Sequence, residues 1–348
     1  YVDTAKKVIV EVNTTQPLDL VGMADIYMRK NPPFCEPIPI LHAGDRVGTP
    51  YIPCDPSKIV AIVPCDMPDV TRALAPLDDD AEAMGNNLVD FLKNEVKHGR
   101  LPENLLPLQS GVGNVANAVI HGLVESDFQN LSVYTEVIQD GMFDLIDKDK
   151  IDMISGTSLS PSPDGLKRFY ANIQKYNKKI VLRPQEISNN GEVVRRIGVI
   201  GMNTALEMDI YGHVNSTHVT GTKLMNGIGG SGDFARNAFL SCFFCHSTPK
   251  GGKNSAVVPM CSHVDHTEHD THVFISEQGV ADVRGLTPKE RAKVIINNVA
   301  HPSYRDQLMD YYERACAACG NSQTPHLLKE AFKFHESLAE TGDMHFKK

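Results

Sequence analysis

The feature that most constrains the fold of this chain is an alternation of apolar strands with amphipathic helices along most of its length. Residues 59–65 form an apolar run of strand length, and residues 81–98 then place apolar side chains at helical spacing. A glycine turn and a helix over residues 115–123 follow the next strand. Further strands are expected in a segment ending near Ser110 and over residues 131–135, 151–155, 179–183, 198–207, 255–260 and 272–276. This alternation predicts an α/β fold with a largely parallel sheet.

Local signals refine this outline. Residues 287–290 have a capping-box arrangement with proline at the first helical position, and Thr324-Pro325 is expected to start the final helix in the same way. The apolar run at residues 239–244 is interpreted as the face of a buried helix. The turn-rich acidic stretch from Pro68 to Asp80 is the expected domain boundary. Because residues 1–12 read as a strand already in progress, we expect the chain to begin partway through a longer protein.

Composition excludes several classes of protein. The chain has 348 residues, of which 41% are hydrophobic and 22% charged, values typical of a folded globular protein. A formal net charge of -9, without a concentrated basic patch, argues against a nucleic-acid partner. No apolar run approaches the roughly 20 residues of a membrane span. No targeting segment is recognisable, but one could have been lost with a preceding part of the protein.

Eight cysteines are too few for a disulfide scaffold, which favours a reducing compartment. Cys242 and Cys245 form one C-x-x-C pair, and Cys316 and Cys319 form another. The two pairs lie much further apart than the ~15–20 residues usual in zinc modules. Cys242 and Cys245, followed by His246, also match the haem attachment pattern. We interpret both pairs as structural cysteines, because free cysteine is among the most buried residue types.

Two glycine-rich loops fit the dinucleotide fingerprint on paper: residues 111–116 as G-x-G-x-x-A and residues 227–232 as G-x-G-x-x-G. The fingerprint also requires an acidic residue after a second strand, about 20 residues on. The second loop fails this requirement, while Glu136 nearly satisfies it for the first. However, Pro107 and Gln109 are poor residues for the central strand of a nucleotide fold. Tight turns that serve packing, or a backbone that approaches a ligand closely, remain the alternatives.

Glu136 is placed at the carboxyl end of the strand expected at 131–135, where ligands bind in open α/β sheets. A lone glutamate in such a position is often only a surface or helix-starting residue. Here, however, the surrounding motifs resemble the acetyl-CoA hydrolase/transferase family, which includes succinyl-CoA:acetate and 4-hydroxybutyrate CoA-transferases. The motifs are SGVGNVANA (110–118), YTEVIQDG (134–141) and NGIGGSGDFARNA (226–238), with further matches at 202–219, 258–270, 276–292 and 324–331.

The resemblance implies two related open α/β CoA-transferase-type domains with the active site between them. Residues 1–70 would be the C-terminal remainder of the first domain, and residues 71–348 the second, catalytic domain. The missing part of the first domain would complete the fold, so activity without it is in question.

The resemblance also implies a ping-pong mechanism through a glutamyl-CoA thioester on Glu136. The backbone N–H groups of Val112 and Gly230 would form the oxyanion hole, in which one donor is typically worth roughly 3 kcal/mol. Candidates to contact CoA or substrate are Gly111, Gly113, Asn114, Val115, Asn189, Asn226, Lys250, Glu277 and Arg72. For Lys250, Arg72 and Asn189 the alternatives are a solvated lysine, a surface charge and a turn.

No cofactor is expected, because coenzyme A is a substrate. The expected partners are acyl-CoA and small carboxylic acids, with acetate and succinate first, and a homodimer. The compartment stays open between mitochondrion, related organelle and cytoplasm. Hydrolysis of acetyl-CoA by the same glutamate is an alternative, because it requires only that water reach the intermediate.

A metal-dependent function is a second alternative, and a non-catalytic CoA-binding module is a third. Cys261, His263, His266, His269 and His272 fall within twelve residues and could serve a zinc-dependent hydrolase. The polar residues between them favour a loop instead, and the family resemblance implies no metal there.

Overall fold

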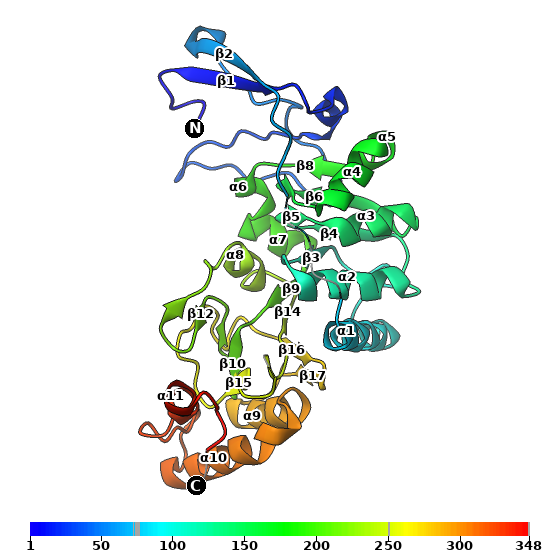
Figure 1. The fold of residues 1–348 in the computed structure, drawn as a ribbon. Coiled ribbons are helices and arrows are strands. Elements are labelled where there is room, and N and C mark those ends of the chain that lie inside the picture. The colour runs from blue at the N-terminus through cyan, green and yellow to red at the C-terminus, as the bar shows by residue number, and fades with distance from the viewer. Residues whose placement is uncertain (72, 74–76, 250, 347–348) are drawn as a thin grey trace.

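A sheet of eight strands runs through the protein in the computed structural model, which describes residues 1–71, 73, 77–249 and 251–346 (Figure 1). The strand order is β17-β16-β14-β9-β3-β4-β6-β8. The strands are β3 (Leu108–Ser110), β4 (Leu131–Tyr134), β6 (Ile151–Gly156), β8 (Ile180–Leu182), β9 (Ile200–Thr204), β14 (Leu240–Phe244), β16 (Val273–Ser276) and β17 (Gly279–Asp282). All neighbours are parallel except β16 and β17. The predicted α/β fold with a largely parallel sheet is confirmed.

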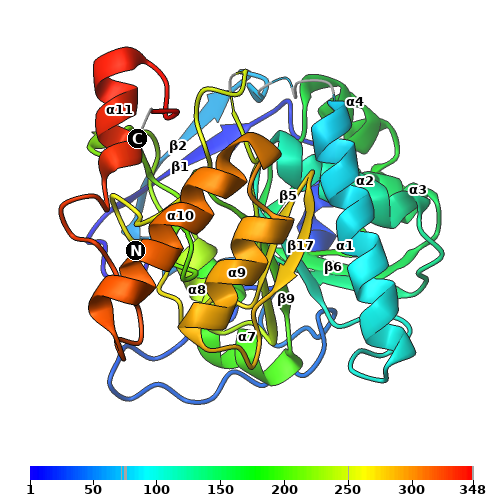
Figure 2. The ribbon, with the colours of Figure 1, turned by 90° about the horizontal axis from the view of Figure 1, so that it is seen from below.

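Helices cover both faces of this sheet. One face packs against α1 (Asp79–Lys97), α2 (Asn114–Glu125), α3 (Asp140–Asp147), α4 (Pro163–Ala171) and α5 (Ile173–Tyr176). The other packs against α6 (Gln185–Ser188), α7 (Gly191–Ile197), α8 (Ser231–Ala235), α9 (Pro288–Asn298), α10 (Pro302–Cys319) and α11 (Lys333–Thr341). Figure 2 shows α1 and α9 on either side of β17. Parallel sheets need this double cover because both of their faces are apolar.

The apolar run at residues 239–244 corrects one prediction. It forms strand β14, not a helix, and every residue from Leu240 to Phe244 is buried. Leu240, Cys242 and Phe244 pack into the core on one face of the sheet, while Phe243 packs into the core on the other. A strand buried on both faces lacks polar alternation, so its sequence cannot be told from a buried helix by periodicity.

The predicted helix starts had mixed outcomes. Thr287 and Glu290 form the expected capping box at the start of α9. Thr324-Pro325, by contrast, starts no helix, because α11 begins only at Lys333. A cap signal needs an amphipathic run directly after it, and here turns intervene.

Two strand predictions were too long. The segment expected at 198–207 divides into β9 and β10 (Glu207–Asp209), and that expected at 255–260 contains only β15 (Val257–Val258). β10 and β15 pair with β11 (Val214–Asn215) in a small separate sheet. The remaining short strands are β5 (Val137–Ile138), β7 (Ser158–Leu159), β12 (His218–Val219) and β13 (Lys223–Leu224). No described helix is long and apolar enough to cross a membrane.

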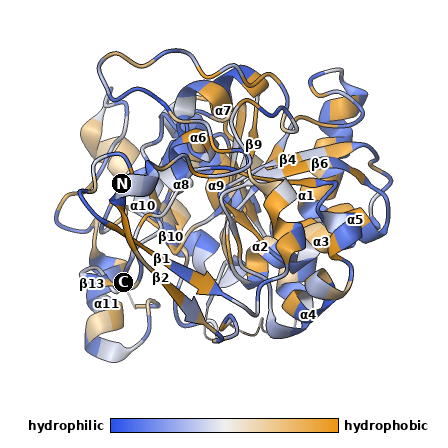
Figure 3. Ribbon diagram, turned by 90° about the horizontal axis from the view of Figure 1, so that it is seen from above, coloured by the Kyte–Doolittle hydropathy of each residue, from blue (hydrophilic) through white to orange (hydrophobic). Residues whose placement is uncertain are grey.

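The first part of the chain contributes a parallel pair, β1 (Val8–Asn13) and β2 (Ile59–Cys65), and two 3-10 helices, η1 (Leu18–Met23) and η2 (Pro56–Lys58). The pair is strongly hydrophobic (Figure 3), yet Ile9, Val60 and Ile62 are each more than half exposed. Between the two strands the chain is anchored to the large sheet by a fully buried ion pair of Asp25 with Arg183.

Candidate functional site

Glu136 lies just beyond the carboxyl end of β4, and its backbone is fixed to both neighbouring strands. The Thr135 N–H donates to the Ser155 carbonyl oxygen at 2.9 Å, and the Thr135 hydroxyl donates to the Ser110 carbonyl oxygen at 3.0 Å. The Glu136 carbonyl oxygen accepts a hydrogen bond from the Thr157 N–H at 2.8 Å. A central parallel strand therefore delivers the carboxylate to the edge where open α/β sheets bind their ligands.

The side chain of Asn189 orients the carboxylate. Asn189 Nδ2 donates to Glu136 Oε2 at 3.2 Å and lies at the same distance from Asp233 Oδ2. The Ser188 hydroxyl donates to Asn189 Oδ1 at 2.8 Å, so the amide nitrogen must face the two carboxylates. Asn189 is therefore a direct neighbour of Glu136. Asp233 was not singled out in the sequence, although it lies only three residues after Gly230.

Gly230 lies against the other side of the carboxylate. An ideal Cβ built at this position would fall 2.0 Å from Glu136 Oε2 and 2.5 Å from Asn189 Nδ2. Its backbone angles, φ -83° and ψ 1°, are open to any residue, so the close approach alone requires glycine here. The neighbouring Gly229 has φ +57°, which turns the loop into α8.

The first glycine loop runs from β3 to α2. The Gly111 N–H donates to the Met202 carbonyl oxygen on β9 at 3.0 Å. Gly113 adopts φ +106° and ψ -174°, a conformation that only glycine adopts readily, directly before α2. Its N–H donates to Gln139 Oε1 at 3.3 Å, so the loop is tied to the connection that carries Glu136. Gln139 follows Glu136 by three residues and was missed in the sequence.

A cavity of about 400 Å³ opens in front of Glu136. It is lined by both glycine loops and by the strand ends between them. Of the predicted site residues, it brings together Gly111, Val112, Glu136, Asn226 and Gly230. The Asn226 amide donates to the Ser216 carbonyl oxygen at 2.9 Å and so braces the second loop.

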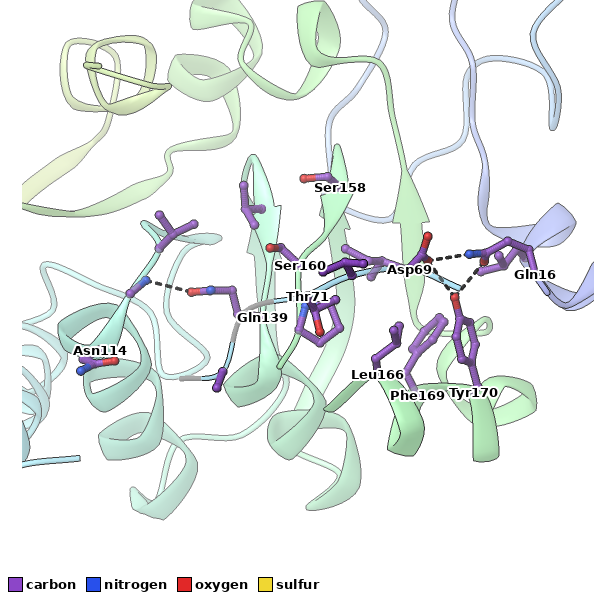
Figure 4. Close-up of a pocket in the computed structure, with 18 residues that line it drawn as sticks. Gln16, Asp69, Thr71, Asn114, Gln139, Ser158, Ser160, Leu166, Phe169 and Tyr170 are labelled. Carbon is purple, nitrogen blue, oxygen red and sulfur yellow. Dashed lines mark hydrogen bonds between the residues drawn. The ribbon is translucent and has the colours of Figure 1, made fainter. Parts of the chain in front are cut away.

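A larger cavity, of about 810 Å³, is shown in Figure 4. It adjoins the first cavity, because Val112 and Val137 line both. The predicted residues Gly113 and Asn114 line this second cavity. Three hydrogen-bonded residues that were not singled out in the sequence form its far wall. The Tyr170 hydroxyl donates to Gln16 Oε1 at 2.8 Å, and Gln16 Nε2 donates to Asp69 Oδ2 at 2.5 Å. Burial, followed by contact with Asp69, raises the pKa of Tyr170, which keeps the phenol protonated.

The other predicted site residues have different outcomes. Val115 lines neither cavity and packs partly buried against the core. Glu277 also lies outside both; it accepts hydrogen bonds from the Ser247 N–H at 2.9 Å and from Gln278 Nε2 at 3.0 Å. Burial raises the pKa of Glu277, but these hydrogen bonds outweigh burial and hold it below its usual value. Arg72 and Lys250 lie outside the described residues.

The histidine cluster does not converge on one point. His263 pairs with Asp265, His266 with Ser231, and His272 with the backbone of Ser241. Among the described residues, no three or more His, Cys, Asp or Glu side chains are grouped as they would be around a metal ion.

The cysteine pairs are thiols. All eight cysteines are free. Cys242 and Cys245 are buried, whereas Cys316 and Cys319 are partly exposed. Burial raises the pKa of Cys242 to about 12, so its thiol is unreactive at neutral pH.

Comparison with known proteins identifies the family. Residues 1–64 match the acetyl-CoA hydrolase/transferase N-terminal domain, and residues 165–312 match the C-terminal domain of the same name. The chain is 49% identical over 354 residues to the acetyl-CoA hydrolase of Yarrowia lipolytica, covering all of this chain and 67% of the relative. The chain belongs to the acetyl-CoA hydrolase/transferase family.

Another member of the family is the succinyl-CoA:acetate CoA-transferase of Clostridium kluyveri, 59% identical over 344 residues. That match covers 99% of this chain but 64% of the relative, so the chain spans about two thirds of the length of such relatives.

Solved structures share the family fold. RipA from Yersinia pestis superposes with a TM-score of 0.66 at 23% identity, over 89% of this chain and 63% of that one. The 4-hydroxybutyrate CoA-transferase from Porphyromonas gingivalis gives 0.64 at 22% identity, over 90% of this chain and 67% of that one.

Proposed function

We propose that the protein containing this chain transfers coenzyme A between an acyl-CoA and a carboxylic acid, through a thioester on Glu136. The observation that carries the proposal is the setting of Glu136, a carboxylate oriented by Asn189, pressed against Gly230 and open to a cavity. A carboxylate attacks as an anion and has no proton to lose, so this nucleophile needs no general base. By relation to the named family members, acetyl-CoA or succinyl-CoA is the expected donor, and acetate or succinate the acceptor.

The first half-reaction makes the enzyme thioester. A Glu136 oxygen attacks the thioester carbonyl carbon, the C–S bond breaks, and coenzyme A leaves as a thiolate while a mixed anhydride forms. The thiolate then attacks the glutamyl carbonyl carbon, and the first acid leaves as a carboxylate. A second carboxylic acid reverses these steps and departs as its CoA ester.

Each step passes through a tetrahedral oxyanion, and we assign its stabilisation to the N–H groups of Val112 and Gly230. Both residues line the cavity with Glu136, on opposite glycine loops. Within the described part of the chain, neither N–H is paired with a backbone carbonyl. Such preorganised donors typically account for about 3 kcal/mol of barrier lowering each.

The adjoining cavity provides space for the remainder of coenzyme A, and the start of α2 at Asn114 faces it. Binding energy from this remote part of the substrate can be used at the reacting carbonyl. No cofactor beyond coenzyme A enters the scheme.

We also propose the division into residues 1–70, the remainder of a first domain, and residues 71–348, the catalytic domain. The exposed apolar pair β1–β2 supports it, because parallel strands are ordinarily covered on both faces. About a third of the length of the Clostridium kluyveri relative lies outside its match to this chain, and that additional part is the expected cover.

Covalent trapping tests the proposed function. The protein is incubated with acetyl-CoA and treated with borohydride, which reduces a glutamyl thioester to an alcohol, and the peptides are mapped by mass spectrometry. We expect reduction at Glu136 that requires acetyl-CoA and disappears in Glu136→Gln. An unmodified Glu136 in protein that still consumes acetyl-CoA would refute the mechanism.

Hydrolysis of acyl-CoA by the same glutamate is the second candidate function. Several relatives, including the one from Yarrowia lipolytica, carry the name acetyl-CoA hydrolase. The two functions share the thioester and differ in whether water or a second acid attacks it.

A further inference from the structure

Attack by water on the glutamyl-CoA thioester needs a base, and the site lacks one once Glu136 carries coenzyme A. Among the described residues that line the cavity of about 400 Å³ in front of Glu136, Glu136 has the only titratable side chain. Once Glu136 carries coenzyme A, it can no longer accept a proton. Water activation must therefore run through a lining residue connected to a titratable group behind it.

Two lining hydroxyls have such a connection, and one of them is poorly suited. The Ser216 hydroxyl lies 3.4 Å from Asp265 Oδ2, close to the limit for a hydrogen bond. Burial raises the pKa of Asp265, but hydrogen bonds from Ser216 and Thr217 outweigh it and hold the pKa below its usual value. A carboxylate so well satisfied is a weak base.

The other hydroxyl is that of Ser231, which directly follows Gly230. His266 Nε2 lies 3.1 Å from Ser231 Oγ, and His266 itself is not one of the residues that line the cavity. The Ser231 hydroxyl also has the Ile228 carbonyl oxygen within 2.8 Å, so its proton can turn from the carbonyl to the imidazole. A neutral imidazole with its proton on Nδ1 presents Nε2 as the acceptor.

The surroundings of His266 keep the ring fixed and neutral. The residue is 2% exposed, its ring packs 4.8 Å from that of Phe243, and its backbone pairs with Val214. Burial lowers the pKa of His266, and Arg236 adds to the effect, while Asp265 and Asp270 oppose it without reversing it. At neutral pH the imidazole is therefore available as a base.

We propose that Ser231 and His266 form a proton relay that activates water against the glutamyl-CoA thioester and so gives the site a hydrolytic branch. Because it assumes the thioester, the inference rests on the proposed function. In this proposal Ser231 and His266 determine how much of the thioester is hydrolysed, although neither residue takes part in the transfer steps.

The hydrolytic step conserves atoms and electrons. The water oxygen bonds to the glutamyl carbonyl carbon while one water proton passes to Ser231 Oγ and the serine proton passes to His266 Nε2. The C–S bond breaks with its electron pair on sulfur, and His266 returns the proton to the departing thiolate. Glu136 is released as a carboxylate after its remaining proton goes to solvent.

The ratio of hydrolysis to transfer tests the relay. Protein with acetyl-CoA alone reports hydrolysis as continued release of acetate and free coenzyme A beyond one equivalent per site, and protein with acetyl-CoA and succinate reports transfer as succinyl-CoA. General-base assistance contributes typically ~10²–10⁴-fold, so Ser231→Ala and His266→Gln should each lower the ratio at least about tenfold. Ser231→Thr keeps the hydroxyl and should restore it.

The pH profile adds an independent readout. In the unmutated protein, hydrolysis should persist at the ordinary histidine pKa of about 6.5 and fall only at lower pH, because burial lowers the pKa of His266 and so delays its protonation. In His266→Gln this dependence should be lost.

Several outcomes would overturn the relay. Hydrolysis and transfer that decline together in both variants would show that Ser231 only positions Gly230. A protein that traps coenzyme A on Glu136 but releases no acetate beyond the one molecule per site that thioester formation sets free would also refute it. Failure of trapping in the unmutated protein would instead refute the proposed function, so the two failures are distinguishable.

Discussion

Substitution of Gly230 by alanine is the most direct test of the site geometry. The ideal Cβ would lie 2.0 Å from Glu136 Oε2, whereas real Cβ atoms essentially never come within 3.0 Å of another heavy atom. The carboxylate oxygen must therefore retreat by about 1 Å, or the loop must move by as much. The backbone angles at Gly230 suit alanine, so the steric contact is the only perturbation.

The size of the effect can be worked from that displacement. A misplacement of about 1 Å at a reacting group costs about 10²-fold in rate. Since each factor of ten corresponds to about 1.36 kcal/mol, the barrier should rise by about 2.7 kcal/mol. The same Cβ would fall 2.5 Å from Asn189 Nδ2, so the hydrogen bond to Glu136 is disturbed as well.

The assay compares the rate of succinyl-CoA formation and the yield of trapped Glu136 in Gly230→Ala and in a matched control, Gly232→Ala. In the control, which lies two residues beyond Gly230 at the start of α8, the new Cβ meets only Ile228 Cδ1 at 3.4 Å, an ordinary contact. Thermal unfolding checks that both variants fold. A Gly230→Ala protein with turnover within about threefold of the control would show that the close approach is irrelevant to the reaction.

Two further predictions concern polar contacts. Asn189→Ala should lower kcat by about 10–100-fold, since a hydrogen bond to a charged group is worth about 1.5–3 kcal/mol. Asn189→Asp should be slower still, because it sets a third carboxylate beside Glu136 and Asp233. Steady-state kinetics in which Asn189→Asp is faster than Asn189→Ala would contradict this prediction. Burial raises the pKa of Glu207, but His335 and its other hydrogen-bond partners outweigh burial and hold it below its usual value. This carboxylate therefore contributes stability above pH ~4.3 that is lost as the pH falls through the lowered pKa. Urea unfolding at pH 7 and at about pH 3 should show a smaller loss in Glu207→Gln than in the unmutated protein, and an equal loss would refute the assignment.

The sequence predicted the strands well where turn residues or clearly periodic helices flank them. Strands 59–65 and 131–135 and helix 81–98 were placed within about two residues, because turns and helical periodicity flank them. The run at 239–244 was misread because a strand with two buried faces has no alternation to reveal it. Thr324-Pro325 was misread because a cap signal is local and carries no information on whether the next residues continue as a helix.

The site divides in the same way. Glu136 and the two glycine loops were predicted from motifs that are continuous in sequence, and the structure places residues of all three around one cavity. Asp233 and Gln139 lie inside those motifs but were passed over, because nothing local shows that an amide or a backbone N–H from elsewhere will meet them.

The sequence by itself determined the alternating elements and the family, and it predicted Glu136 as the nucleophile, because the motifs that carry these inferences are short continuous stretches of chain. Only the tertiary structure decided that Gly230 would press on the carboxylate, that Asn189 would orient it, and that Ser231 would stand before His266. These contacts join residues that are 35 to 94 positions apart in the sequence. Gln109 and Asn203, which lie on separate strands and line the same cavity, are likewise joined by a hydrogen bond over 94 positions. Parallel strands bring their carboxyl ends to one edge whatever their separation in sequence, and that edge is where the chemistry is assembled.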